Sequence, residues 1–338
     1  MLQTDTASPG RRPADIASTA PMEARSESTL PTGPGWWFEP KWDGFRCLAF
    51  KDGNQVTLTA KSGKPLGRYF PEVVEHIAGL KAERFLVDGE LLIQTPQGFS
   101  FEALQLRLHP AESRIRRLAR DTPARLVLFD MLLTPKGEDL RGQPLSKRRK
   151  ALESFHGRYG DATLDLTPGT ADRAVAQQWL DEGLLEGIVA KRWDGPYVAG
   201  ERAMVKVKRL RTADCVVGGF RYGQNSKLVG SLLLGLYDAG GRLNHVGFTS
   251  SIAAADKPEL TKRLEALRGG PGFTGEAPGG PSRWSTERSA EWVPLKPEMV
   301  VEVAFDHVSG GRFRHGTKLV RFRPDKRPDQ CGCEQLNG

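Results

Sequence analysis

Short apolar runs separated by glycine, proline and charged residues fill the chain from Trp36 onward. Runs of this length, rich in branched and aromatic side chains, are typical of buried β-strands. We expect strands in the first part of the chain at 45–50, 56–58, 85–87, 91–93, 126–129 and 187–190. Residues 71–80 and 171–180 have helical spacing instead. Because strands and helices do not alternate regularly, the pattern predicts an α+β fold rather than a doubly wound sheet.

The pattern changes after Arg211, where strands dominate. We expect them at 215–220, 231–237, 245–248, 299–303 and 318–322. One helix, at about 257–267, has Leu260, Leu264 and Leu267 on a single face. Five strands and one helix are the components of an OB-fold barrel, a common nucleic-acid binding module.

The two patterns divide the chain into domains. Residues 1–30 are rich in serine, threonine, alanine, proline and charge and have no apolar period, so we expect a disordered tail. The first domain then covers residues 31–209, with a boundary near 209–213. The β-rich domain covers residues 210–333, and residues 334–338 form a second tail.

Charge favours a polyanionic partner. The 338 residues contain 49 Lys and Arg against 41 Asp and Glu, a formal net charge of +8. A basic surface gains affinity for phosphates by releasing counterions, although many basic proteins are merely soluble. No apolar run is long enough to span a bilayer, and the N-terminus does not resemble a secretory signal.

Cysteine usage gives no sign of a disulfide framework. The four cysteines, Cys47, Cys215, Cys331 and Cys333, are few and scattered, and the last pair has no histidine companion for a metal site. We therefore expect a protein of the reducing cytoplasm with no membrane partner.

The first candidate motif runs from Glu39 to Arg46 and contains Lys41, Asp43 and Gly44. A lysine is a nucleophile only as the free amine, so it needs neighbouring cations or loss of solvent. Asp43-Gly44 favours a tight turn between strands that would direct Lys41 and Arg46 toward one pocket. The alternative is an ordinary hairpin turn with solvated charges.

Further motifs place charged groups on strands. Glu90 and Glu186 lie at the edges of apolar runs, where carboxylates need metals, hydroxyl donors or basic partners. Lys206 and Lys208 alternate along one strand and share a face, where they repel unless an anion lies between them. Phe129 ends a strand and could stack on a purine, although such phenylalanines are more often core residues.

The order and spacing of these motifs resemble the covalent nucleotidyltransferase superfamily, which contains DNA ligases, RNA ligases and mRNA capping enzymes. Lys41 with Arg46 is followed by Asp88-Gly89-Glu90, Phe129-Asp130, Glu186-Gly187, Lys206 with Lys208, and Arg323-Pro324-Asp325-Lys326. Segments such as Tyr69-Phe70-Pro71-Glu72-Val73 and Arg211-Thr212-Ala213-Asp214-Cys215 make the chain similar to small bacterial ATP-dependent DNA ligases of the ligase C type.

This resemblance implies a nucleotidyltransferase (adenylation) domain at 31–209 and an OB-fold domain at 210–333. It implies that Lys41 attacks the α-phosphate of ATP, that the resulting AMP passes to the 5′-phosphate of a nick, and that the 3′-hydroxyl then displaces AMP. All three steps are phosphoryl transfers, in which catalysis is mostly alignment and charge neutralisation.

The resemblance also implies a role for each motif residue. Glu39 recognises the adenine amino group and Phe129 stacks on the base. Glu90 and Glu186 hold ribose and a divalent ion, Mg²⁺ or Mn²⁺. The α-phosphate contacts are Arg46, Lys206 and Lys208. The last motif orients the pyrophosphate and contributes catalytic residues besides Lys41 and Asp43, namely Arg323, Asp325 and Lys326.

One position departs from the family pattern. Members commonly have a Ser-Arg pair after the first motif, whereas this chain has Ala60-Lys61-Ser62. Lys61 keeps the positive charge but lacks the planar fork of arginine, so we expect it to contact the nucleotide less specifically.

The expected partners are ATP and nicked double-stranded DNA, bound by a monomer whose basic segments 221–227 and 312–318 grip the duplex. Two alternatives remain at this point. One is an RNA ligase or a GTP-dependent capping enzyme. The other is a catalytically silent module that binds nicks or ends.

Overall fold

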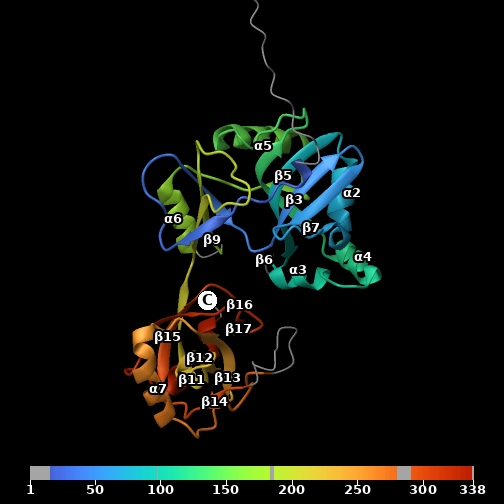
Figure 1. The fold of residues 1–338 in the computed structure, drawn as a ribbon. Coiled ribbons are helices and arrows are strands. Elements are labelled where there is room, and N and C mark those ends of the chain that lie inside the picture. The colour runs from blue at the N-terminus through green and yellow to red at the C-terminus, as the bar shows by residue number, and fades with distance from the viewer. Residues whose placement is uncertain (1–15, 97, 183–185, 280–290, 337–338) are drawn as a thin grey trace, which may run out of the picture. The chain divides into compact units, whose positions relative to one another are not determined.

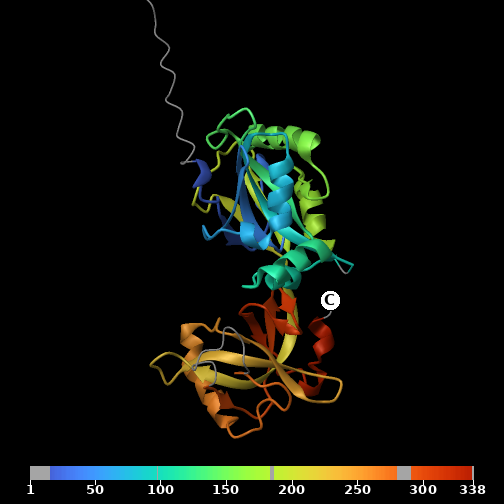
Figure 2. The same ribbon diagram turned by 90° about the vertical axis from the view of Figure 1, so that its right-hand side faces the viewer.

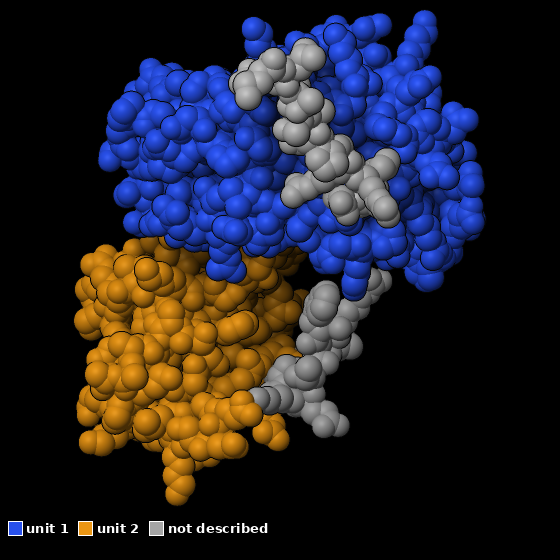
Figure 3. Space-filling view, turned by 45° about the horizontal axis from the view of Figure 1, so that its top comes forward, with its two compact units in different colours: residues 1–209 blue, residues 210–338 orange. Residues whose placement is uncertain are grey.

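The computed structural model of the chain describes residues 16–96, 98–182, 186–279 and 291–336. The chain divides into two compact units, Met1–Arg209 and Leu210–Gly338, which are coloured separately in Figure 3. Each unit contains both strands and helices, so the predicted α+β class is confirmed.

Unit 1 contains two β-sheets, visible in Figure 1. Sheet 1 has the strand order β1 (Ala24–Glu27), β10 (Met204–Lys208), β9 (Gly187–Arg192) and β2 (Trp36–Lys41). Sheet 2 has the order β4 (Gln55–Ala60), β3 (Phe45–Asp52), β5 (Arg84–Thr95), β7 (Ala124–Leu133) and β8 (Leu164–Leu166), with β6 (Gly98–Phe99) paired to β5.

β5 joins two strands that the sequence suggested were separate, 85–87 and 91–93. The strand continues through Asp88-Gly89-Glu90, and its register with β7 shifts between Asp88 and Gly89. A Cβ at Gly89 would lie 2.7 Å from the carbonyl oxygen of Val127, so only glycine allows β7 to approach this closely. The acidic motif therefore lies inside a strand.

Helices cover sheet 2. They are α2 (Pro71–Gly79), α3 (Phe101–Arg107), α4 (Glu112–Asp121) and α5 (Leu145–Tyr159), with the turn η1 (Gly67–Tyr69) before α2. Proline is favourable at the first position of a helix, and Pro71 begins α2, whose Val73 and Ile77 are fully buried one turn apart. Figure 2 shows α2 across the face of the sheet, where it shares one core with Phe85 and Phe155. The helix predicted at 71–80 is confirmed.

The helix predicted at 171–180 is confirmed as α6 (Arg173–Glu182). It packs on sheet 1 through Ala176, which joins a small core with Phe38, Ile188 and Val205. Sheet 1 thus has its own apolar contact, separate from the main core of sheet 2.

The prediction of a disordered tail over residues 1–30 is wrong for residues 16–30. Residues 24–27 form β1, which pairs in parallel with β10, and Met22 and Leu30 are only 3% and 2% exposed. Isolated apolar residues gave no period because each fills a separate gap in the unit rather than one face of an element. Residues 1–15 lie outside the described part of the chain.

Unit 2 is built on the sheet order β13 (Leu243–Thr249), β12 (Val229–Tyr237), β11 (Arg211–Tyr222), β15 (Val300–Phe305) and β18 (Lys318–Phe322). A parallel bridge between Thr249 and Thr317 brings the two outer strands together. Helix α7 (Lys257–Ala266), preceded by the turn η2 (Ala254–Asp256), lies between β13 and β15 in the chain. This arrangement is a partly closed five-stranded barrel and confirms the predicted OB-fold.

Smaller elements complete unit 2: β14 (Val293–Pro294), β16 (Val308–Ser309), β17 (Arg312–Phe313), η3 (Pro328–Gln330) and η4 (Cys333–Leu336). The predicted tail at 334–338 is wrong for residues 334–336, because Leu336 is 6% exposed and joins the barrel core with Cys331. Residues 337–338 lie outside the described part. None of the described helices is long and apolar enough to cross a membrane.

Candidate active site

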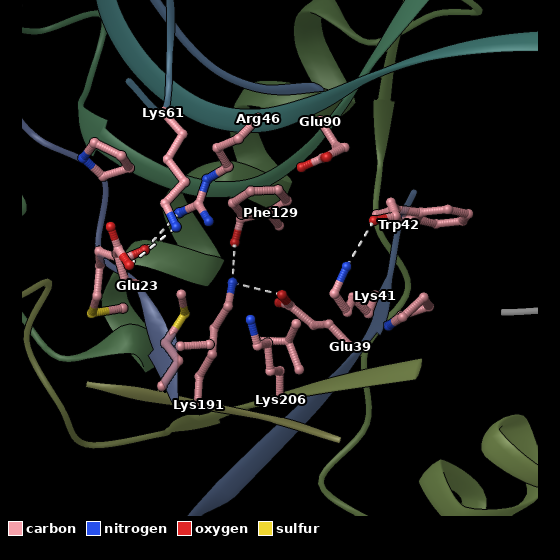
Figure 4. A pocket seen from close by; sticks show the side chains of 16 residues that line it. Glu23, Glu39, Lys41, Trp42, Arg46, Lys61, Glu90, Phe129, Lys191 and Lys206 are labelled. Carbon is pink, nitrogen blue, oxygen red and sulfur yellow. Dashed lines mark hydrogen bonds and ion pairs between the residues drawn. The ribbon is translucent and has the colours of Figure 1, made fainter. Parts of the chain in front are cut away.

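A pocket of about 190 Å³ in unit 1 is lined by residues of both sheets (Figure 4). Sheet 1 and the segment before it contribute Pro21, Met22, Glu23, Ala24, Glu39, Pro40, Lys41, Val189, Lys191, Met204 and Lys206. Sheet 2 and the adjoining turns contribute Trp42, Arg46, Lys61, Glu90 and Phe129. Most of the residues predicted for the site therefore meet in one place.

Lys41 is the last residue of β2 and pairs in register with Gly187 of β9. Its ammonium forms an ion pair with Glu186, whose other oxygen lies 3.0 Å from Nζ of Lys208. Burial raises the pKa of the Glu186 carboxyl, but the two ammonium groups outweigh this and hold the pKa below its usual value. Glu186 therefore stays ionised between two lysines.

Gly187 makes this arrangement possible. A Cβ at this position would lie 2.2 Å from the carbonyl oxygen of Val207 in β10, so a side chain would force the strands apart. Because Lys41 and Lys208 sit on the strands that flank β9, the glycine keeps both lysines within reach of Glu186.

Lys206 is the cation without a neutralising partner. Val205 and Val207 are buried on one face of β10, and Lys206 and Lys208 are partly exposed on the other, as alternation predicts. Among the described residues Lys206 forms no hydrogen bond or ion pair. Burial lowers its pKa, and the nearby charges of Lys41 and Lys208 lower it further. A group that brings negative charge to this position would be stabilised.

Asp88 holds the side chain of Arg46 through two hydrogen bonds. The guanidinium donates from Nε to Oδ1 at 2.6 Å and from Nη2 to Oδ2 at 2.6 Å, and Asp88 is fully buried. Burial alone would lower the pKa of Arg46, but the charge of Asp88 raises it well above its usual value. Tyr197 also donates to Asp88, at 2.6 Å, and accepts from the backbone N–H of Met22.

Glu90 lies beside Arg46 on the neighbouring strand, directly opposite in register. Burial raises the pKa of its carboxyl to about 7, even though Arg46 and Lys41 act in the opposite direction. Its oxygens form no hydrogen bond or ion pair with the residues that the structure describes. A partly buried carboxylate of this kind suits a divalent ion or a hydroxyl donor.

At the other end of the pocket, around Glu39, most buried polar groups are paired, although Nη1 of Arg149 has no hydrogen-bond partner among the described residues. Glu39 is 2% exposed, and its carboxylate accepts from Trp37 at 3.1 Å and forms ion pairs with Lys191 at 2.6 Å and with Nη1 of Arg149 at 3.6 Å. Lys191 also donates to the backbone oxygen of Phe129 at 3.0 Å. The ring of Phe129 is partly exposed to the pocket and lies 4.6 Å from the guanidinium carbon of Arg46.

Lys61 and Asp43 are less central. Lys61 lines the pocket and forms an ion pair with Glu23 at 3.1 Å, which lowers the pKa of Glu23. Asp43 lies in the turn between β2 and β3 and is not among the lining residues. The close packing of that turn depends on Gly44, where a Cβ would lie 2.2 Å from the carbonyl oxygen of Leu91.

The last predicted motif belongs to unit 2, where Asp214 organises it. Arg323 lies 2.9 Å from one oxygen of Asp214, and Lys326 lies 2.8 Å from the other. Arg323 also binds Asp325 at 2.9 Å and lowers the pKa of that carboxyl to about 2. These residues form one ion cluster within their own unit.

Sequence reasoning assigned no role to Lys191, Asp88, Glu23 or Asp214. Asp88 could have been found, because it precedes Glu90 by two residues on one strand and Arg46 lies on the next. Lys191 gave no signal, because a lysine near the end of an apolar run usually extends into solvent. It is buried here because β9 is a central strand, paired on both sides.

Comparison with known proteins gives consistent results. The family model described as "ATP dependent DNA ligase domain" matches residues 20–208, and the one described as "ATP dependent DNA ligase C terminal region" matches residues 225–326. DNA ligase C of Mycobacterium tuberculosis (strain H37Rv) is 42% identical, over 94% of this chain and 93% of its own length. DNA ligase C1 of Mycolicibacterium smegmatis is 41% identical over the same shares.

More distant matches extend the comparison. A protein of Mycolicibacterium smegmatis named multifunctional non-homologous end joining protein LigD is 30% identical over 94% of this chain and 40% of its own length. Among solved structures, one titled "Pmar-Lig_Pre." has a TM-score of 0.62 at 16% identity, covering 90% of this chain and 68% of that chain. At this identity the likeness concerns the fold alone.

Proposed function

Because this chain belongs to the ATP-dependent DNA ligase family, we propose that it seals nicks in double-stranded DNA through AMP carried covalently on Lys41. The observation that carries the proposal is the position of Lys41, which lines a pocket together with Arg46 and with Lys206, a lysine that forms no ion pair with the described residues. Cations drawn from both sheets surround one lysine, which is the arrangement that transfer of a phosphoryl group to an amine requires.

The proposed reaction has three balanced steps. The neutral Lys41 amine forms an N–P bond to the α-phosphate of ATP and loses a proton, the bond to the β-phosphate breaks, and pyrophosphate leaves. A 5′-phosphate oxygen at the nick then attacks the same phosphorus, the N–P bond breaks, and the Lys41 amine leaves with a proton taken up from solvent. The 3′-hydroxyl finally attacks the 5′-phosphate, loses its proton and expels AMP. Each step spreads negative charge on phosphate oxygens, which positioned cations stabilise.

We assign the roles that the family resemblance implies, and the positions of the side chains support them. Arg46, Lys206 and Lys208 are the cations near Lys41, and we assign them to the α-phosphate. Glu39 receives the adenine amino group, and Phe129, whose ring is partly exposed to the pocket, stacks on the base. We assign pyrophosphate to the cluster of unit 2, which comprises Arg323, Asp325 and Lys326. Asp43 and Lys61 keep secondary roles at the turn and at the pocket wall.

We assign a divalent ion, Mg²⁺ or Mn²⁺, to the carboxylates of Glu90 and Glu186, of which Glu186 is also paired with Lys41 and Lys208. Glu90 has no protein partner among the described residues, and hard oxygen ligands that share an ion with substrate phosphates are typical of Mg²⁺ sites. When bound, the ion would neutralise phosphate charge. Glu186 keeps its negative charge at neutral pH because its pKa is held low.

We place the activity in DNA repair in the cytoplasm, carried out by a monomer. The name of one relative, a non-homologous end joining protein, supports the repair role. In unit 2, Arg221 and Arg312 lie in segments that we assign to DNA contact. The basic net charge of +8 favours such a partner.

Sealing of a labelled nicked duplex tests the proposal. We expect ligation with ATP and Mg²⁺, no ligation with GTP, and none by Lys41→Ala. Parallel substrates with DNA or RNA on either side of the nick separate a DNA ligase from an RNA ligase. Equal sealing by the Lys41→Ala variant would refute the covalent mechanism.

A further inference from the structure

Lys191 is a buried cation that none of the proposed chemical steps uses. It is 3% exposed, although its position near the end of β9 would normally let a lysine reach solvent. Burying an ammonium is costly unless it is paired and hydrogen-bonded, so its contacts must compensate. They are Glu39 at 2.6 Å and the backbone oxygen of Phe129 at 3.0 Å.

Those two contacts join different sheets. Glu39 belongs to β2 of sheet 1, and Phe129 belongs to β7 of sheet 2. Figure 4 shows the ammonium between them, with dashed lines to both. Its nitrogen also lies 4.7 Å from the centre of the Phe129 ring. One side chain therefore spans the gap between the sheets at the end of the pocket where Glu39 and Phe129 meet.

We infer that Lys191 is a positioning residue that determines the choice of base. By holding one oxygen of Glu39 and the backbone of Phe129, it fixes the hydrogen-bond acceptor relative to the stacking ring. The inference rests on the proposed function, because it takes these two residues to read the 6-amino group and the face of adenine. Recognition of an amino group by a preorganised acceptor gives strong discrimination against an analogue that lacks the group.

The carboxylate has other partners, but they do not replace this one. Trp37 and Arg149 approach the other oxygen, Oε1, at 3.1 and 3.6 Å. Among the described residues, neither of them forms a hydrogen bond or a ring contact with Phe129. Only the ammonium of Lys191, among the contacts described, ties the acceptor and the ring together.

The test measures the dissociation constants of ATP and of purine riboside triphosphate, which is ATP with its 6-amino group replaced by hydrogen. Calorimetry without divalent ions gives both constants whether or not Lys41 reacts. We expect the parent to prefer ATP about 30-fold, as a hydrogen bond to a charged acceptor allows. In Lys191→Met and Lys191→Gln the preference falls to about threefold, through weaker ATP binding.

Lys51 provides a matched control. It is another buried lysine, 2% exposed, whose ammonium donates to the carbonyl oxygens of Ala78 and Leu80. Lys51→Met removes a buried ammonium of the same kind, but Lys51 is not among the lining residues. We expect it to lower the thermal midpoint and to leave the preference for ATP unchanged.

Two further variants separate positioning from bulk stability. Lys191→Arg keeps a charged donor and should restore the preference to within about threefold of the parent. In a Glu39→Gln background, Lys191→Met should change the preference by less than about twofold, because a residue that acts through another shows non-additive effects. Full additivity would show that Lys191 does not act through Glu39.

Three results would overturn the inference. An unchanged preference in either folded variant without the ammonium, or failure of Lys191→Arg to restore it, overturns the inference. Equal weakening for both nucleotides overturns it as well. Formation of lysyl-AMP by the parent, measured separately with Mg²⁺, tests the proposed function and can fail independently.

Discussion

The two ends of the pocket differ in whether their charged side chains are paired with other residues of the protein. At one end, Glu39 and Lys191 are almost completely buried and bonded to each other. At the other, Lys206 and Glu90 form no hydrogen bond or ion pair with the residues that the structure describes, and burial lowers the pKa of Lys206 and raises that of Glu90. Among the described residues, the protein pairs the charged groups of the first end except for one nitrogen of Arg149, and we propose that phosphate and a cation pair those of the second end. We infer that the end with paired, fixed side chains recognises the base. The end with unpaired charges stabilises the negative charge that develops during the reaction.

The largest effect on the reaction rate is expected at the end of the pocket where Lys206 and Glu90 lie, which we call the unsatisfied end. Lys206→Ala should slow formation of lysyl-AMP by about 10²- to 10³-fold, because a positioned cation is lost from the transition state. The free energy of unfolding should change little, since Lys206 forms no hydrogen bond or ion pair with the described residues and lies beside the like charges of Lys41 and Lys208. Single-turnover labelling with ATP measures the rate, and Lys150→Ala, at an exposed site on α5, is the control. A parental rate in Lys206→Ala would contradict the assignment.

Asp88→Asn should weaken the contacts that hold Arg46 and Tyr197 in place. Asp88 is fully buried and holds both Arg46 and Tyr197. Removing one partner of a buried ion pair costs about 3 kcal/mol in the free energy of unfolding, and the freed arginine should also bind phosphate less well. Urea denaturation measures the first effect and the KM for ATP the second. A variant as stable as the parent would show that Asp88 is dispensable.

Glu90 should make the free energy of unfolding depend on pH. Because burial raises the pKa of Glu90 to about 7, the folded state binds a proton that the unfolded state releases near pH 4.5. The contribution of Glu90 to stability is therefore lost as pH rises between these values. Without Mg²⁺ and ATP, Glu90→Gln should be more stable than the parent at pH 8 by about 3 kcal/mol. The two should converge near pH 4.5, and parallel stability profiles would refute this.

The smallest effect should come from the pocket wall. The ion pair between Glu23 and Lys61 is partly exposed, with side chains 28% and 58% accessible. Such pairs contribute about 0.5 kcal/mol or less, so Glu23→Gln should raise the KM for ATP by about twofold at most. Steady-state kinetics at low and high salt would measure it. A loss as large as that of Lys206→Ala would mean that the N-terminal segment takes part in the chemistry.

The sequence predicted those parts of the fold that local pattern determines. The periodicity of Val73 and Ile77 located α2, and alternation on β10 placed Lys206 and Lys208 on one face. Tertiary context determined the rest. β1 exists because β10 offers a free edge, and β5 continues through Asp88 because a glycine lets β7 approach.

The same limit applies to the candidate site. Order and spacing of motifs indicated Lys41, Glu90 and Phe129, which line the pocket. The motifs did not indicate a role for Lys191. The role that we infer depends on Glu39 and Phe129, which are far from Lys191 in the chain and lie on different sheets. The function of such a residue lies in the geometry between strands, which sequence spacing does not reveal.

The central claim is that Lys41 carries AMP, and peptide mapping by mass spectrometry tests it most directly. The purified protein would first be treated with pyrophosphate to remove any resident AMP, then incubated with ATP and Mg²⁺ and digested. The account predicts one AMP on the peptide that contains Lys41, and none with GTP or in Lys41→Ala. AMP on another residue, or no AMP under any condition, would contradict it.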